Sequence, residues 1–139
     1  MRTVTIFAAI LILTALTAFA GEKTMMTIKV TSNGKTTVFQ LNNGTAAKEL
    51  YAQLPLNLDV KDFGGNEKIF YPPNKLSTAN TPSANSKKGS LSYYAPWGDV
   101  VMFYKDFGSA PGLYELGNAV SGAENISQMR ETILIEKGE

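Results

Sequence analysis

Hydrophobic and polar residues alternate near the start of the chain, on both sides of an Asn-Gly pair. The segment 26–41 reads MTIKVTSNGKTTVFQL, in which Ile28 and Val30 are separated by polar residues. Alternation with period two is typical of a half-buried strand. Asn33-Gly34 suits a two-residue turn, because both central positions of a type I′ turn need a positive φ. The pattern therefore predicts a β-hairpin over 26–41.

The next segment changes from period two to the spacing of a helix. Apolar side chains recur at i, i+3, i+4 and i+7, at Ala47, Leu50, Tyr51 and Leu54. Thr45 is the expected N-cap of this helix, and Pro55 ends it because proline cannot continue the hydrogen-bond ladder.

Period two returns after Pro55, and short apolar runs separated by turn residues continue to the C-terminal end. A Ser-, Asn-, Thr- and Pro-rich stretch interrupts them and predicts a long surface loop, forming a rim or a lid, over 77–90. Many short strands with regularly spaced turns favour a closed barrel or a sandwich. The expected elements are strands near 54–60, 69–71, 91–94 and 99–104, a short strand within 112–122, a closing strand at 131–137, a Gly64-Gly65 turn, and a short helical segment near 123–129.

The first twenty residues have the pattern of a secretory signal peptide. A short basic start with Arg2 precedes an apolar run over 4–18, and Ala18-Phe19-Ala20 matches a cleavage site. We expect cleavage and export to a periplasmic or extracellular location, with a retained anchor as the alternative. Cleavage would leave 119 of the 139 residues, which is one ordinary domain over 21–139.

Composition narrows the chemistry that the chain can perform. The chain has no His and no Cys, which excludes Ser-His-Asp and Cys-His catalysis and the usual zinc sites. Without the leader, twelve basic residues balance twelve acidic ones, so the domain has no charge excess for nucleic acid or an anionic membrane. We expect no metal and no cofactor, and Arg130 is the single arginine outside the leader.

Three stretches of the sequence together resemble the bacterial cyclophilin-like fold proteins, small barrel domains that are mostly of unknown function. These stretches read DFGGNEKIFYPPNKLS, GSLSYYAPWGDVVMFYKDFG and GLYELGNAVSGAENISQM, and the resemblance extends from Thr27 to Lys137. It implies a mainly β fold, a closed eight-stranded cyclophilin-like β-barrel with two short helices capping its ends.

The same resemblance gives a test of peptidyl-prolyl isomerase activity. In true cyclophilins, the resemblance implies, an arginine on a core strand donates a hydrogen bond to the prolyl nitrogen, and a glutamine and a histidine position the peptide. That hydrogen bond weakens the amide resonance behind a barrier of about 20 kcal/mol. Here the segment before the polar loop carries Lys61, Lys68 and Lys75 but no arginine, and Arg130 comes far later in the chain. No catalytic residue is therefore carried over.

The aromatic residues supply the candidate site instead. The stretch 93–108 holds six of the fourteen aromatic residues and includes Trp97, the only tryptophan, in a turn between Pro96 and Gly98. We interpret Val101 and Phe103 as core residues of a strand covered on both faces. Tyr and Trp combine an apolar ring with a polar tip, which suits a ligand cleft. The candidate ligand-binding residues are Phe63, Asn66, Glu67, Tyr71, Tyr93, Tyr94 and Trp97.

Three functions agree with these patterns. The leading hypothesis is a non-catalytic exported module that binds a small ligand or an extended peptide on an aromatic concave face. The first alternative is a peptidyl-prolyl isomerase whose hydrogen-bond donor is Lys68, Asn66 or a tyrosine hydroxyl rather than arginine. The second is an accessory protein that docks through the loop 77–90 and an open strand edge. The oligomeric state is left open by the sequence.

Overall fold

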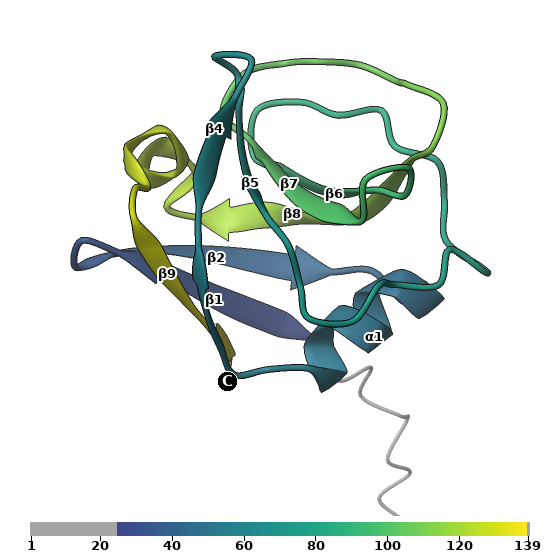
Figure 1. Ribbon diagram of the computed structural model, residues 1–139, viewed down its shortest axis with the longest axis horizontal. Helices are drawn as coiled ribbons and strands as arrows, with labels where there is room; N and C mark the ends of the chain where they lie inside the picture. Colours follow the sequence, from purple (N-terminus) through teal and green to yellow (C-terminus); the bar gives the residue numbers. More distant parts are fainter. Residues whose placement is uncertain (1–24, 139) are drawn as a thin grey trace, which may run out of the picture.

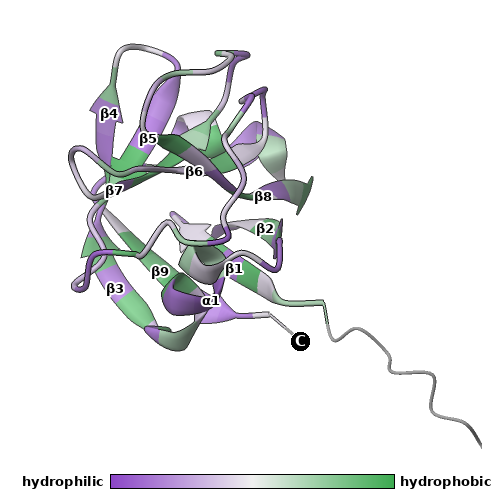
Figure 2. Ribbon diagram, turned by 90° about the vertical axis from the view of Figure 1, so that its right-hand side faces the viewer, coloured by the Kyte–Doolittle hydropathy of each residue, from purple (hydrophilic) through white to green (hydrophobic). Residues whose placement is uncertain are grey.

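The computed structural model describes residues 25–138, so the predicted leader lies outside the described residues. Nine strands form one antiparallel sheet in the order β3-β9-β1-β2-β8-β6-β7-β5-β4. The strands are β1 Thr27–Ser32, β2 Lys35–Leu41, β3 Leu56–Asp59, β4 Lys61–Phe63, β5 Glu67–Phe70, β6 Ser90–Tyr94, β7 Asp99–Phe103, β8 Leu113–Ser121 and β9 Thr132–Lys137. Figure 2 shows the strands β4 to β8 in its upper half, above β1, β2, β3 and β9.

The two ends of the sheet are joined by the chain itself. β3 pairs with β9 and β4 pairs with β5, yet only Val60 separates β3 from β4. The Val60 N–H donates to the carbonyl oxygen of Glu131 at 2.9 Å, which holds this bend against the start of β9. Counted as one bent strand, 56–63 makes the sheet a nearly closed eight-stranded barrel, which confirms the cyclophilin-like barrel that the resemblance implied.

The predicted hairpin over 26–41 is confirmed as β1 and β2. The register places Ser32 opposite Lys35, and the two turn residues have φ of 51° at Asn33 and 72° at Gly34. Ile28 and Val30 are fully buried in the barrel core, as their alternation indicated. At the other end of the chain, Ile133 and Ile135 of β9 enter the same core.

Two short helices cover the barrel. The helix α1 spans Thr45–Ala52, and the 3-10 helix η1 spans Ala123–Gln128. Figure 1 shows α1 at the lower right of the barrel and η1 at its upper left. Leu50 of α1 and Ile126 of η1 are both fully buried in the main core. Neither helix within the described residues is long and apolar enough to cross a membrane.

One detail of the helix prediction was wrong. Gly44, in an extended conformation, is the N-cap of α1, and Thr45 is its first helical residue. The Ala46 N–H, in the first turn of the helix, donates instead to the hydroxyl oxygen of Thr81 at 3.2 Å. A side chain that is distant in sequence therefore satisfies the helix terminus, which a local capping pattern could not reveal.

Candidate functional site

A second, smaller hydrophobic cluster lies on the face of the sheet turned away from the barrel core. Successive residues of a strand point to opposite faces. Val100 and Met102 of β7 belong to the main core, while Val101 and Phe103 belong to the outer cluster. The buried members of the outer cluster are Ile69, Ala84, Val101, Phe103 and Leu113. The strand β7 is therefore covered on both faces, as its continuous apolar run predicted.

The connection between β5 and β6 and the connection between β7 and β8 cover this outer cluster. Ala84 donates its N–H to the Leu113 carbonyl at 3.0 Å, and Ser86 donates its N–H to the Gly108 carbonyl at 2.8 Å. The Ser86 and Ser92 hydroxyls lie 3.0 Å apart in a buried hydrogen bond. The predicted surface loop 77–90 is thus tied to both β6 and the connection between β7 and β8.

A pocket of about 210 Å3 opens beside this cluster. It is lined by Phe63, Glu67, Tyr94, Trp97, Asp99, Val101, Phe103, Phe107, Ala110 and Leu113. The rings of Phe63 and Tyr94 both meet the Trp97 ring edge-on, with centroids 5.1 and 5.4 Å away and interplanar angles of 84° and 79°. The pocket therefore has aromatic walls arranged around one half-exposed indole.

Two carboxyl groups lie among these aromatic rings. Glu67 begins β5 and Asp99 begins β7, and the two residues are only 9% and 1% exposed. The Oδ1 atom of Asp99 is buried and has no hydrogen-bond partner within residues 25–138. Burying an unpartnered polar atom costs free energy, which makes Asp99 an exception that calls for a functional explanation.

Burial shifts the protonation of both acids in the same direction. Desolvation raises the pKa of Glu67, and the nearby Asp99 charge raises that pKa further. Desolvation also raises the pKa of Asp99, while its own backbone N–H partly opposes the effect by stabilising the carboxylate. Ionisable groups perturbed by burial inside a cleft are a common mark of functional sites.

Four of the seven predicted ligand-binding residues line this pocket: Phe63, Glu67, Tyr94 and Trp97. The other three lie elsewhere. Tyr93 is buried in the main core, where its hydroxyl oxygen accepts the Leu76 N–H at 3.1 Å. Tyr71 is exposed, and the Asn66 carbonyl accepts the Tyr104 N–H at 3.0 Å. The difference between Tyr93 and Tyr94 follows from strand alternation, since neighbours point to opposite faces.

The sequence did not single out Asp99, Phe103 or Phe107 as pocket residues, although all three line the pocket. Phe103 was interpreted as core only, yet it is buried and also faces the pocket, where its ring stacks on Phe107 with centroids 5.2 Å apart. Asp99 was not among the candidate ligand-binding residues. Its position opposite Tyr94, in the hairpin that carries Trp97, was a signal that could have linked it to the aromatic residues.

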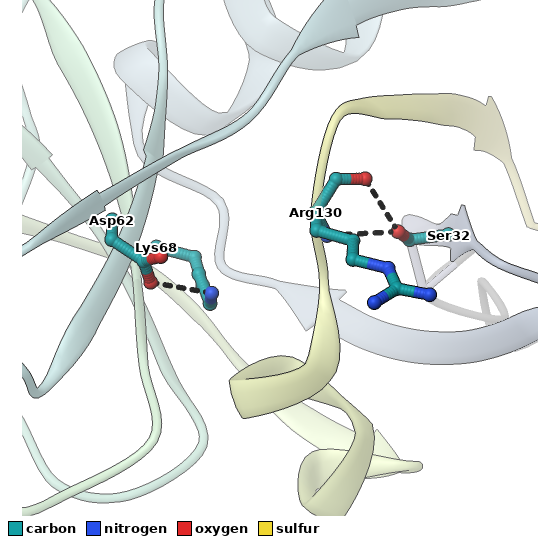
Figure 3. Close-up of polar contacts among 4 residues, drawn as sticks. All are labelled: Ser32, Asp62, Lys68 and Arg130. Atoms are coloured by element: carbon teal, nitrogen blue, oxygen red, sulfur yellow. Dashed lines mark hydrogen bonds and ion pairs between the residues drawn. The ribbon is translucent and has the colours of Figure 1, made fainter.

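A second cavity lies apart from the aromatic pocket, and three basic side chains line it. It has a volume of about 530 Å3 and is lined by Asn33, Lys35, Asp62, Lys68, Ser127, Gln128, Met129 and Arg130. The buried Lys68 forms an ion pair with Asp62 (Figure 3). Across the cavity, the Ser32 hydroxyl bonds to both backbone groups of Arg130, at 3.2 and 3.3 Å. Lys68 follows Glu67 directly and faces the opposite side of β5, so its ammonium group lies away from the aromatic pocket.

The nearly closed antiparallel barrel with two short helices has the architecture of a small cyclophilin-like domain. The model of the Cyclophilin-like family matches residues 30–136, and the chain belongs to this family. The chain also resembles the solution structure of the hypothetical protein AF2241 from Archaeoglobus fulgidus. The TM-score is 0.66 at 14% identity, over 85% of this chain and 99% of the other, which supports the fold alone. No curated protein matches the sequence.

Proposed function

We propose that this cyclophilin-like domain is an exported, non-catalytic binding module that holds a small ligand, or one side chain of an extended peptide, in the aromatic pocket. The observation that carries the proposal is the half-exposed Trp97, 49% accessible, standing between the rings of Phe63 and Tyr94 at the pocket. An indole left open to solvent beside a concave apolar surface is suited to contact a ligand. Export is part of the proposal through the leader pattern of residues 1–20.

The pocket favours a compact group over a long strand-like ligand. In the described part of the chain, β5, β6, β7 and β8 each have a partner strand on both sides, and β4, which carries Phe63, is an end strand of three residues paired with β5 alone. A peptide could therefore add few backbone hydrogen bonds by extending the sheet. Docking through the loop 77–90 is likewise less favoured, because that loop hydrogen-bonds to the domain itself.

Binding is tested with a fragment set in three charge classes: neutral, cationic and anionic. We expect at least one fragment to shift Trp97 fluorescence, and Ala110→Phe, which fills the pocket, to weaken its binding about tenfold or more. Ligand-observed NMR measures binding independently of the indole. Tyr71→Ala is the matched control, because it removes an exposed aromatic ring that does not line the pocket. Equal binding to the wild type and to Ala110→Phe by every fragment would contradict the proposal.

A measurement of the rate of prolyl isomerisation distinguishes the isomerase alternative from a non-catalytic binding module. Of the donors named for it, Lys68 lines the other cavity and Asn66 is not among the pocket residues, which leaves the Tyr94 hydroxyl. A neutral hydroxyl is a weaker donor than the guanidinium that cyclophilins are expected to use. In a protease-coupled assay with an Ala-Pro peptide, we expect the uncatalysed rate. An acceleration that Tyr94→Phe abolishes would establish the isomerase instead.

A further inference from the structure

The aromatic pocket has walls of a kind that attracts positive charge. The face of an aromatic ring carries partial negative charge, and a cation within about 6 Å of the ring centre is attracted to it. Five aromatic rings line the pocket: Phe63, Tyr94, Trp97, Phe103 and Phe107. The rings of Phe63 and Tyr94 stand nearly perpendicular to the indole, so the walls turn in different directions around one space.

The same pocket contains two carboxyl groups, and no cationic side chain stands in the described part of its lining. Glu67 and Asp99 both line it, and the described residues of its lining include no lysine and no arginine. The Oδ1 atom of Asp99 lacks a hydrogen-bond partner in this part of the chain. Buried carboxylates are normally paired with a cation or a donor, and within residues 25–138 the Asp99 Oδ1 has neither.

Other classes of ligand fit this combination less well. An anion would be repelled by the two carboxylates, and a purely apolar ligand would leave the Asp99 oxygen unpartnered. A metal ion usually takes several oxygen, nitrogen or sulfur ligands, but no group of three candidate ligand residues occurs among the described residues. The remaining lining is apolar, which suits the methyl and methylene groups of an organic cation.

We propose that the pocket selects organic ammonium ions, with the aromatic walls holding the alkyl groups around the nitrogen and the carboxylates of Glu67 and Asp99 neutralising its charge. This rests on the proposed binding function and names the class of ligand. A volume of about 210 Å3 is sufficient for a head group such as a methylated ammonium or the end of a basic side chain.

The affinity should depend on pH, because the cation pairs with ionised carboxylates. Burial raises the pKa of Glu67 and of Asp99, so both acids take up protons at a higher pH than exposed carboxyls do. Binding of a permanent cation is therefore expected to weaken as the pH falls through these raised pKa values. Among the described residues, the other ionisable groups nearby include the Tyr94 hydroxyl in the lining, and the Tyr93 hydroxyl and the Lys75 side chain, which both approach Gly98 next to Asp99.

The test compares choline with 3,3-dimethylbutan-1-ol, in which a carbon replaces the quaternary nitrogen. The two molecules have the same shape, and only choline is charged. Dissociation constants are measured by NMR titration of the isotope-labelled protein, following the Trp97 indole N–H. We expect choline to bind about tenfold more tightly than the alcohol. In Glu67→Gln/Asp99→Asn the ratio should fall severalfold, to the smaller preference that the aromatic rings alone provide.

Asp59→Asn is the control for net charge, because Asp59 is exposed on β3, outside the pocket, and should leave the ratio unchanged. The single variant Glu67→Gln and the pH dependence of the wild type replace the double variant if that one does not fold. Equal affinity for choline and the alcohol would overturn the ammonium assignment, and a ratio that removal of the carboxylates leaves unchanged would overturn the role proposed for Glu67 and Asp99. The proposed binding function would then still stand if neutral fragments occupy the pocket, and it would fall only if no fragment of any class does.

Discussion

Replacing Gly117 with alanine is expected to destabilise the protein by about 3 kcal/mol or more. A Cβ atom at this position would lie 2.1 Å from the Gln40 carbonyl oxygen and 3.0 Å from the Leu41 Cα. Both obstacles belong to the backbone of the neighbouring strand β2 and cannot rotate away. Gly117 pairs with Leu41 on one side and with Leu91 on the other, next to an irregularity in the β6–β8 register. Such bulges bend a sheet and help a barrel close.

Urea unfolding followed by circular dichroism measures this loss, with Gly34→Ala as the control. Gly34 has a φ of 72° and nothing within 4 Å of an added Cβ atom. Its replacement therefore carries only the strain of a left-handed backbone, roughly 1–2 kcal/mol. A cost for Gly117→Ala no larger than that of Gly34→Ala would contradict the close approach of β2 and β8.

Replacing Asp99 with asparagine is expected to stabilise the protein by about 1–3 kcal/mol at neutral and alkaline pH. The carboxylate is buried, and its Oδ1 has no partner within residues 25–138, so folding removes its hydration without compensation there. Asparagine keeps the shape and removes the charge. A change that improves stability at a pocket residue would agree with a site kept for binding rather than for packing.

The stabilisation by Asp99→Asn should depend on pH, and the direction follows from the raised pKa of Asp99. Because burial raises the pKa of Asp99 in the folded state, the folded protein binds this proton more tightly than the unfolded chain does. The proton bound to Asp99 therefore stabilises the folded protein fully below the ordinary pKa of aspartic acid, near 3.9. This stabilisation is lost as the pH rises through the raised pKa of Asp99 in the folded protein. The advantage of Asp99→Asn should grow over the same range.

Urea unfolding at a series of pH values checks this prediction. Asp59→Asn removes the same charge from an exposed position on β3 and corrects for the general effect of net charge. An advantage of Asp99→Asn that is absent at pH 7, or largest at acid pH, would show that the carboxyl is not desolvated in the folded protein.

Much of the fold could be predicted because local patterns determine it. The hairpin β1–β2 follows from alternation around Asn33-Gly34, and β7 follows from its unbroken apolar run. The start of α1 was misplaced by one residue because Thr81, far along the chain, accepts the hydrogen bond that a local cap would have accepted. Local patterns also could not show that 56–63 bends at Val60 to pair with both β9 and β5.

Part of the candidate site could likewise be predicted from local sequence patterns, and part could not. The sequence predicted Phe63, Glu67, Tyr94 and Trp97 as candidate site residues, because aromatic and acidic side chains close to turns stand out in a neutral chain, and these four line one pocket. It could not separate Tyr94 from Tyr93, since that depends on which face of β6 meets the core.

The sequence by itself determined a mainly β domain of the cyclophilin-like kind, whose composition lacks the histidine, and whose central region lacks the arginine, of the related isomerases. Only the tertiary structure decided that Lys68 faces one cavity while the preceding Glu67 faces another, and that Glu67 joins Asp99 among aromatic rings. Residue type is written in the sequence. Burial, pairing and the electrostatic partner of a charge arise from strand register and barrel closure, which bring together residues that are distant along the chain.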